Sequence, residues 1–591
     1  MSRHRSATFA LVAVTCALWA WFGVVRTASR AADTITLSIV GTNDLHGRIF
    51  TDRFGRGGLT VLGGFVENLR AARAADGGAL LLFDAGDTFQ GGIESNLSEG
   101  QVVVDAYNAM GYTALAIGNH DFDYGPVDPR EPVAATLASQ SPGATASDMR
   151  GALKVAAARG RFPFLAANII DVATNRPVAW PNVSPSAIVE AAGVRVGIIG
   201  LMTVNGLSQT LLSHVVGLRT AALLSTVQEQ AASLRQRGAE IVIVVAHEGG
   251  WCDDTSDPRD LRSCDDSSEI FDVARRLPRG TVQAIVAGHT HGTVAHIVNE
   301  IPITSVPEGG TQFGRMDLQV DAATHRVTSV RVHPPRAICT RENVVSHACD
   351  VAPNGVPSQY EGRPVAPSSR VAAAMAPELA RVETLRAVPL GAVVENTIGR
   401  AGGPETALGN LFADALRESI PGADVALSYG PGRGGLRADL PPGVLTFGPV
   451  YDLFPFDNRV VRMGVTGAQL GRSLEDQLTR PRGGLLSVSG VRVIVACEAG
   501  GPRVQLTRDD GRPVVATDRY VVAATSYSAG RAAWSVLEGE SGVDAVEQPL
   551  LVRDVVATWL KRRGGRLRAT DFLDPTRPRW ILPPQGETCR T

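Results

Sequence analysis

The stretch TLSIVGTNDLH, residues 36–46, places two metal-binding side chains directly after an apolar run. The run Thr36–Val40 has the length and the β-branched residues of a buried strand. Asp44 and His46 follow within the next six residues. A carboxylate and an imidazole are both ligands for divalent metal ions. The stretch therefore predicts a buried strand whose carboxyl end carries part of a metal site.

The same arrangement recurs four times in the first half of the chain. The further strand-like runs are residues 80–83, 114–117, 241–245 and 282–286, and the motifs after them are Gly86-Asp87, Gly118-Asn119-His120-Asp121, Ala246-His247-Glu248 and Gly288-His289-Thr290-His291. In a sheet of buried strands, the loops at the carboxyl ends converge on one crevice, where ligands bind. We therefore expect the five loops to meet.

Five such loops would gather three Asp or Asn oxygens and four imidazoles. This is the ligand count for two divalent metals that share a bridging carboxylate, a centre used in phosphate-ester hydrolysis. The mixture of oxygen and imidazole ligands suits Zn, Mn, Fe or Co better than calcium alone. A lone histidine at a strand end would more often be a packed core residue, but five coincident strand ends favour the metal centre.

The ordered motifs D-x-H, G-D, G-N-H-D, H-E-G and G-H-x-H resemble those of the calcineurin-like metallophosphoesterases. The versions in residues 42–47 and 118–123 look more narrowly like the 5'-nucleotidase family, which includes periplasmic UDP-sugar hydrolases and ecto-5'-nucleotidases. The resemblance implies an α/β fold: a four-layer metallophosphoesterase sandwich followed by a smaller α/β substrate-binding domain.

The resemblance also implies a role for each residue of the centre. One metal would be held by Asp44, His46 and His291, the other by Asn119, His247 and His289, with Asp87 as the bridge. A hydroxide between the two metals would attack the phosphorus. His120, oriented by Asp123, would stabilise the transition state or protonate the leaving oxygen. Asn119 is also expected to face the substrate.

Length and composition limit the other possibilities. A chain of 591 residues is too long for one hydrophobic core, so at least two domains are expected. With a formal net charge of −2, the chain has no long-range attraction for nucleic acid polymers or acidic membranes. The expected partner is a small phosphate ester such as a nucleotide, held locally by metals and arginines. Oligomeric state is left open.

The N-terminus has the pattern of an export signal. Arg3 and Arg5 precede an apolar run from Ala7 to Val25, and small residues follow it in residues 27–32. The run is also close to the minimum length of a membrane span. We expect residues 1–32 to be a signal peptide that directs the protein to the periplasm or the exterior, with an uncleaved outward-facing membrane anchor as the alternative.

Six of the 7 cysteines lie beyond this segment, an even number, as is common in exported chains. The nearest pairs are Cys252 with Cys264 and Cys339 with Cys349, which would leave Cys497 with Cys589. Six cysteines allow fifteen connectivities, so this proximity is a preference and the alternatives stay open.

We predict four regions along the chain: the N-terminal segment 1–32, a metallophosphoesterase domain at 34–336, an irregular linker with a helix at 337–389, and a C-terminal domain at 390–584. The first domain alternates strands with helical patterns such as Thr220–Gly238. The linking helix is expected at Val371–Arg386, with its first turn set near Pro377.

By resemblance, the C-terminal domain supplies the substrate pocket. Phe456 and Tyr527 match the positions of two aromatics that sandwich a base, and Arg437 matches an arginine that binds phosphate. Gly432 stands where the family has an asparagine, and Ala533 lies near the position of the aspartate that holds the ribose hydroxyls. We therefore expect weak discrimination between ribose and deoxyribose.

The predicted function is an exported, dinuclear-metal hydrolysis of 5'-nucleotides or related phosphate monoesters. A UDP-sugar diphosphatase, a 2',3'-cyclic nucleotide phosphodiesterase or a sulfate-ester hydrolase on the same fold are alternatives. A non-catalytic binding protein is a further alternative, which the complete set of ligands and His120 disfavours.

Overall fold

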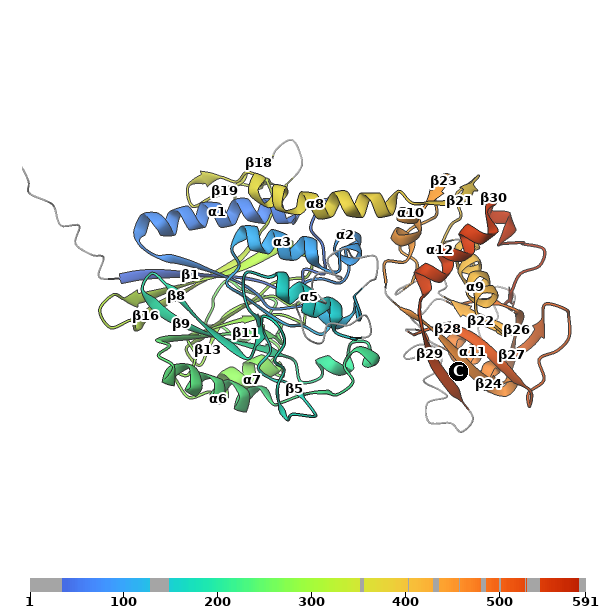
Figure 1. Ribbon diagram of the computed structural model, residues 1–591, viewed down its shortest axis with the longest axis horizontal. Helices are drawn as coiled ribbons and strands as arrows, with labels where there is room; N and C mark the ends of the chain where they lie inside the picture. Colours follow the sequence, from blue (N-terminus) through green and yellow to red (C-terminus); the bar gives the residue numbers. More distant parts are fainter. Residues whose placement is uncertain are drawn as a thin grey trace, which may run out of the picture.

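The computed structural model describes residues 34–127, 148–350, 355–401, 403–428, 435–456, 458–479, 485–498, 501–526, 528 and 543–583. The predicted N-terminal segment, Gly432, Tyr527, Ala533 and Cys589 therefore lie outside the described residues. Figure 1 shows two groups of elements along the longest axis, joined along one edge by a helix.

Two facing sheets form the centre of the N-terminal domain. The first has the order β16-β15-β1-β2-β3-β4-β7 and the second β13-β14-β12-β11-β9-β8. The strands of the first are β1 (Thr34–Thr42), β2 (Ala79–Asp84), β3 (Ala114–Ala116), β4 (Phe164–Leu165), β7 (Val183–Ser184), β15 (Gln312–Asp321) and β16 (Val327–Ala337). Those of the second are β8 (Ser186–Ala191), β9 (Val194–Met202), β11 (Ile241–His247), β12 (Ala284–Ala287), β13 (Val294–Val298) and β14 (Ile301–Ser305).

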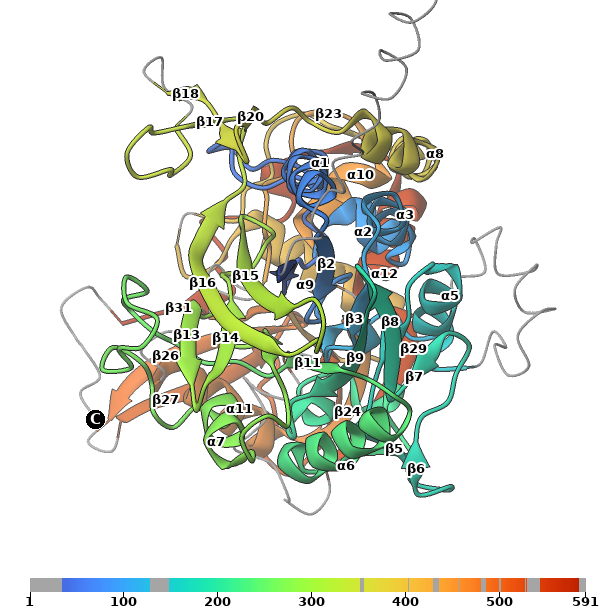
Figure 2. The ribbon, with the colours of Figure 1, turned by 90° about the vertical axis from the view of Figure 1, so that its left-hand side faces the viewer.

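The apolar strand residues explain why the sheets pack face to face. Leu37 and Phe83 from the first sheet and Ile198 and Ile243 from the second belong to one buried cluster. Burying both faces of a sheet requires such near-continuous apolar runs. On the outer faces lie α1 (Leu59–Asp76), α3 (Gln101–Met110) and α5 (Gly151–Arg159) on one side and α6 (Leu223–Gln236) and α7 (Glu269–Arg276) on the other (Figures 1 and 2). The result is the predicted four-layer α/β sandwich.

The five predicted strand runs all coincide with strands, but they belong to two sheets. The parallel strands β1, β2 and β3 carry the first three motifs, and the parallel strands β11 and β12 carry the other two. Because both sets end at the same edge of the sandwich, the loops meet between the sheets. The loops thus converge as expected, from the two sheets of the predicted sandwich.

Helix α8 (Ser369–Arg386) joins the two domains and nearly matches the predicted range Val371–Arg386, but its first turn does not lie near Pro377 as predicted. It begins after Ser368, whose hydroxyl accepts a hydrogen bond from Val371 N at 3.3 Å, and Pro377 lies inside the helix. A proline inside a helix removes one backbone hydrogen bond. The Ser368 cap and the burial of Val371 and Met375 in the core of the first domain compensate for that loss.

The C-terminal domain is a smaller α/β unit, which confirms the predicted fold class. Its main sheet has the order β25-β22-β28-β24-β29. The strands are β22 (Val425–Ser428), β24 (Arg459–Thr466), β25 (Ser487–Ser489), β28 (Arg519–Thr525) and β29 (Asp544–Leu551), and the helices packed around them are α9 (Ala407–Ser419), α10 (Phe447–Leu453), α11 (Gly467–Thr479) and α12 (Val552–Arg563).

Smaller sheets complete the C-terminal domain. They are β23-β21-β30, formed by β21 (Pro389–Val394), β23 (Gly443–Thr446) and β30 (Gly565–Leu567), and β27-β26-β31, formed by β26 (Val491–Glu498), β27 (Gly501–Arg508) and β31 (Trp580–Ile581). Among the described residues, no helix is long and apolar enough to cross a membrane.

Candidate metal centre

Two groups of predicted ligands lie between the ends of the two sheets. Asp44, His46 and His291 each offer a ligand atom within 4.8 Å of the others, and so do Asp87, His247 and His289. In the first group, His46 Nε2 lies 3.3 Å from His291 Nε2, which lies 3.4 Å from Asp44 Oδ1. The predicted ligands of one metal are thus brought together.

The second group also includes Asn119, as predicted. His247 Nε2 lies 3.0 Å from Asn119 Oδ1, 3.2 Å from Asp87 Oδ2 and 3.2 Å from His289 Nδ1. Asp87, Asn119 and His247 are all at most 2% exposed. The other carboxylate oxygen of Asp87 accepts a hydrogen bond from the backbone N–H of His120 at 2.8 Å.

The backbone at this centre is strained. Asp44, His46, Asp87, His289 and His291 all have positive φ angles, between 49° and 72°. Residues other than glycine rarely adopt this left-handed conformation, and such strain gathers at functional sites. Five of the seven predicted ligands are therefore held in unfavourable backbone conformations that place their side chains in one crevice.

Close packing explains a glycine in one ligand motif. A Cβ atom at Gly288 would lie 3.0 Å from the Cβ of Asn43 and 3.2 Å from Asp44 Oδ2. The backbone N–H of His289 donates to the same Asp44 oxygen at 2.9 Å. A side chain at position 288 would therefore push apart the loops that follow β1 and β12.

Hydrogen bonds to backbone carbonyls orient two of the imidazoles. Nδ1 of His46 lies 3.1 Å from the carbonyl oxygen of Gln90, and Nδ1 of His247 lies 2.8 Å from that of Ala85. When Nδ1 donates to a carbonyl, the neutral ring presents the lone pair of Nε2 on its other side. In both residues Nε2 faces the other predicted ligands.

The chemistry of these atoms fits a pair of cations. Asp44 Oδ1 is buried and makes no hydrogen bond of good geometry among the described residues, since His291 Nε2 lies 3.4 Å away, although such atoms are normally paired. Imidazole nitrogens and carboxylate or amide oxygens, all electron-pair donors, converge around it and around Asp87. A divalent cation in each group would satisfy these lone pairs together.

Two buried aspartates that were not predicted as site residues hold the loops in place. Asp84 accepts hydrogen bonds from the hydroxyls of Thr42, Thr88 and Tyr107. Asp121 accepts from the N–H groups of Thr88 and Gly118, which join the second and third ligand loops. Burial raises the pKa of Asp84 to about 6, and burial together with the nearby charge of Asp87 raises the pKa of Asp121. The sequence signals for them were only the place of Asp121 at the end of its motif and that of Asp84 two residues before Gly86.

His120 and Asp123 form the predicted pair. Nδ1 of His120 lies 2.7 Å from Asp123 Oδ2, and Asp123 Oδ1 accepts from the hydroxyl of Thr210 at 2.7 Å. Burial lowers the pKa of His120, but the Asp123 carboxylate outweighs it and the pKa rises to about 10. The His120 side chain is 37% exposed, so its ring combines a fixed orientation with access to a bound substrate.

Glu308 is a further neighbour that sequence reasoning missed. Its carboxylate lies 3.4 Å from Nδ1 of His291 and 3.9 Å from the guanidinium of Arg48. A carboxylate on the far nitrogen of a ligand histidine orients the ring and increases its basicity. No motif marks Glu308, which lies seventeen residues beyond His291.

In the C-terminal domain, the structure brings two of the predicted pocket residues together. The Arg437 guanidinium carbon lies 5.0 Å from the centre of the Phe456 ring, and the rings of Phe454 and Phe456 meet edge to face at 5.3 Å. The preceding carbonyl, that of Pro455, accepts a hydrogen bond from Asn96 Nδ2 at 3.1 Å. Asn96 belongs to α2 (Ile93–Leu97), so the segment that carries Phe456 touches the N-terminal domain.

Two of the preferred cysteine pairings are present. Disulfides join Cys252 to Cys264 and Cys339 to Cys349. The third predicted pair includes Cys589, which lies outside the described residues.

Comparisons with known proteins agree with this architecture. The family model described as calcineurin-like phosphoesterase matches residues 37–293, and the model described as 5'-nucleotidase, C-terminal domain, matches residues 384–539. The boundaries that we predicted for the domains, 34–336 and 390–584, remain predictions.

The relatives that match most of the chain are distant in sequence. Protein UshA of Yersinia enterocolitica is 24% identical over 552 residues, which cover 89% of this chain and 90% of UshA. A cell wall protein of Listeria monocytogenes is 24% identical over 539 residues, and the match spans 85% of this chain but only 64% of that protein. The crystal structure of a 5'-nucleotidase precursor from Thermus thermophilus covers 93% of this chain and 100% of its own, with a TM-score of 0.54 and 23% identity. That likeness concerns the fold alone.

Proposed function

Since the chain belongs to the 5'-nucleotidase/UshA family of metallophosphoesterases, we propose that it hydrolyses 5'-nucleotides or related phosphate monoesters with the help of two divalent metals. The observation that carries the proposal is the pair of ligand groups beside the His120–Asp123 pair in one crevice. Members of the calcineurin-like family typically use two metals, and this chain offers two His and Asp groups for them.

Each metal would have its own ligands. Asp44, His46 and His291 would hold one ion. The second ion would be held by Asn119, His247 and His289, and both ions would share the Asp87 carboxylate. Zn, Mn, Fe or Co fits this mixture of oxygen and nitrogen ligands. Such a metal pair supplies charge neutralisation for the phosphoryl group and increases the acidity of water.

The chain itself supplies a positioned imidazole. Asp123 holds Nδ1 of His120, so Nε2 is the nitrogen available to a substrate. A protonated His120 can donate a hydrogen bond to a phosphoryl oxygen or a proton to the leaving alkoxide. Thr210 fixes the Asp123 carboxylate and thereby the orientation of the ring.

For specificity, we propose that the C-terminal domain contributes Phe456, Tyr527 and Arg437. The first two would stack on a base and the arginine would bind phosphate. The contact between Phe456 and Arg437 and the link from Pro455 to Asn96 support a role at the domain boundary. Nucleotides are the substrates that would use both an aromatic platform and the metal centre. We also propose export to the periplasm or exterior, on the basis of residues 1–32.

A hydrolysis screen tests the proposed function. The purified protein, supplied with Mn²⁺ or Zn²⁺, would be assayed on AMP, dAMP, UDP-glucose, 2',3'-cyclic AMP and p-nitrophenyl phosphate. We expect the highest kcat/KM on a nucleotide monoester, with similar values for AMP and dAMP. Preference for UDP-glucose or the cyclic nucleotide would change the substrate class, and no hydrolysis by the metal-loaded protein would favour a binding protein.

A further inference from the structure

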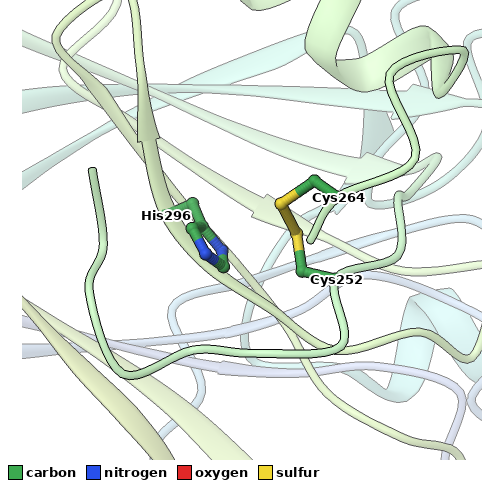
Figure 3. Close-up of side chains that lie close together, drawn as sticks. All are labelled: Cys252, Cys264 and His296. Carbon is green, nitrogen blue, oxygen red and sulfur yellow. A yellow bond between two sulfur atoms is a disulfide. The ribbon is translucent and has the colours of Figure 1, made fainter. Parts of the chain in front are cut away.

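A third group of metal-binding side chains lies outside the candidate hydrolytic site. Cys252, Cys264 and His296 each offer a ligand atom within 4.8 Å of the other two. Figure 3 shows the His296 ring beside the disulfide that joins the two cysteines. Cys252 follows β11, and its N–H donates to the carbonyl of Thr293 at 3.0 Å, just before β13, which carries His296. The group shares no residue with the two groups described above.

His296 has an unusual environment. The residue is 0% exposed, and among the described residues its Nε2 has no hydrogen-bond partner of acceptable geometry. Its other nitrogen, Nδ1, lies 3.3 Å from the backbone N–H of Ala295. An unsatisfied buried polar atom typically costs about 1–3 kcal/mol. If His296 served only to fill this space, an apolar side chain of similar shape could replace it without loss of stability.

The surroundings are acidic. Asp254, Asp257 and Asp260 line a cavity of about 250 Å³ together with Arg262 and Ser263. This segment runs along β13, since the carbonyl of Pro258 accepts a hydrogen bond from Ile297 N at 2.7 Å. Burial lowers the pKa of His296. The backbone of Asp254 and the negative charges of the three aspartates act in the opposite direction, but their effect is smaller. A neutral imidazole near carboxylates is the form that binds a cation.

We propose that Cys252, Cys264 and His296 form a redox-dependent site for one thiophilic divalent cation of the Zn²⁺ class. The disulfide and the metal site are alternative states of the same two cysteines. Two thiolates and one imidazole form a known zinc ligand set that leaves the fourth position open. The disulfide keeps the site closed, because only thiolates bind the metal.

The conversion balances with a dithiol as the reductant. The dithiol transfers two electrons and two protons to the protein disulfide, so that the S–S bond breaks, two thiols form and the reductant becomes a disulfide. Binding of the cation then displaces the two thiol protons to solvent. Two thiolates and neutral His296 remain as its ligands.

The test uses the full-length protein in its oxidised form and after anaerobic reduction with a phosphine. Each form is titrated with Co²⁺ and followed by absorption. Cobalt bound to thiolate gives a sulfur-to-metal charge-transfer band, whereas the oxygen and nitrogen ligands of the hydrolytic site do not. We expect the band, and one additional Co²⁺ per chain, only in the reduced protein, and we expect Zn²⁺ to abolish the band.

Variants locate the site. His296→Ala keeps both cysteines and should weaken Co²⁺ binding in the reduced protein by at least about tenfold. Removing a residue that only hydrogen-bonds to a metal ligand already lowers the metal affinity by about that factor, and His296 would be a ligand itself. Replacing Cys252 and Cys264 by serine should remove the band. The matched control replaces Cys339 and Cys349, the other described disulfide, and should keep it.

A measurement without cysteine substitutions guards against misfolding of the serine variant. In the reduced wild-type chain, Zn²⁺ should protect Cys252 and Cys264 from alkylation, as located by peptide mass spectrometry. The proposal is overturned by a reduced protein without the band, by a band unaffected in His296→Ala, or by protection of other cysteines. Loss of folding on reduction that Zn²⁺ does not reverse would overturn it as well.

Discussion

Nδ1 of His120 lies 2.7 Å from Oδ2 of Asp123, three residues further along the chain. The pair is placed beside the predicted ligands: the His120 and His46 ring centres are 5.6 Å apart. The geometry fits a charged imidazole that acts on the substrate without binding a metal.

His120→Ala should therefore retain both metals and lose roughly two to four orders of magnitude in turnover, the usual loss for a positioned acid–base or electrostatic group. Metal content by mass spectrometry and kcat on p-nitrophenyl phosphate are the measurements. The control is His325→Ala. His325 lies in the turn between β15 and β16, and its ring forms a similar His–carboxylate pair with Glu240. Loss of metal together with the rate would make His120 a ligand instead.

Asp87→Ala tests the shared carboxylate. Asp87 Oδ2 lies 3.2 Å from His247 Nε2, and Asp87 also raises the pKa of His46 in the first group against the larger effect of burial. Because its charge acts on both groups, its removal should lower the metal content below two per chain and abolish turnover. Asp76→Ala, an exposed carboxylate that pairs with Arg73, is the control. Two tightly bound metals with full activity in Asp87→Ala would contradict the assignment.

Asn96→Asp isolates one contact between the domains. Asn96 Oδ1 accepts hydrogen bonds from Gly91 N and the Tyr124 hydroxyl, and aspartate can keep both. Its Nδ2 donates to Pro455 O, and aspartate would instead place two oxygens opposite each other. Losing this hydrogen bond should cost about 1–2 kcal/mol in the free energy of nucleotide binding, which corresponds to a KM for AMP roughly five to thirty times higher. The KM for p-nitrophenyl phosphate should change little.

Asn96→Ala is the companion variant, because it also removes the bonds within the N-terminal domain. Asn96 holds the N–H of Gly91, and the next residue, Gly92, donates its N–H to the carbonyl of His46 in the metal centre. Asn96→Ala should therefore affect the hydrolysis of both substrates. Equal effects of Asn96→Asp on AMP and the small ester would show that the contact with Pro455 does not position the nucleotide.

A buried acidic group should govern stability at low pH. Burial tends to raise the pKa of Asp317, but hydrogen bonds from His333, Arg315 and Ser38 outweigh it and hold the pKa well below its ordinary value. A carboxyl with a depressed pKa in the folded state stabilises the protein above its unfolded pKa of about 4 and loses that contribution as the pH falls further.

The corresponding variant is Asp317→Asn. Its deficit in unfolding free energy relative to the wild type should be on the order of 2 kcal/mol at neutral pH and should shrink as the pH falls below about 4. Thermal melting across this pH range measures the difference, with Glu229→Gln on the exposed face of α6 as the control. A deficit that stays constant with pH would mean that packing, and not ionisation, accounts for Asp317.

The local parts of this structure could be predicted because their signals are local. Five apolar runs ended by Asp, Asn or His gave the strands and the candidate ligands, since each ligand follows its own strand directly. The assignment of those strands to two sheets depends on pairings between distant segments, which periodicity does not reveal. The first turn of α8 was wrongly placed near Pro377 because a proline favours a first turn, whereas the Ser368 cap and packing against the N-terminal domain set the start of the helix.

Residues that act through contacts across the chain left no such signal. Glu308 approaches His291 from the segment that follows β14, and Asn96 meets Pro455 from 359 residues away. Glu308 lies in no motif, and the glycosylation pattern Asn96-Leu97-Ser98 does not point to a contact with Pro455. Each is an ordinary polar residue until the fold brings its partner near.

Phe456 and Tyr527 form the proposed aromatic platform. If Phe456 and Tyr527 stack on a base, Phe456→Leu should keep most of the packing against Phe454 but lose the stacking. Base–aromatic stacking is worth about 1–3 kcal/mol, so the KM for AMP should rise roughly tenfold while that for p-nitrophenyl phosphate stays nearly constant. Tyr527→Ala should show the same selectivity. Arg437→Ala should impair both substrates, because the arginine would bind the phosphate that they share.

The competing explanation is that Phe456 only fills the core of the C-terminal domain, which its contacts with that cluster would also permit. Core packing predicts a lower melting temperature and similar kinetic losses for AMP and the small ester. Stacking predicts selective loss on AMP at unchanged stability. A selective loss in Arg437→Ala, on AMP alone, would separate the arginine from the phosphate and place it with Phe456, whose ring its guanidinium already covers at 5.0 Å.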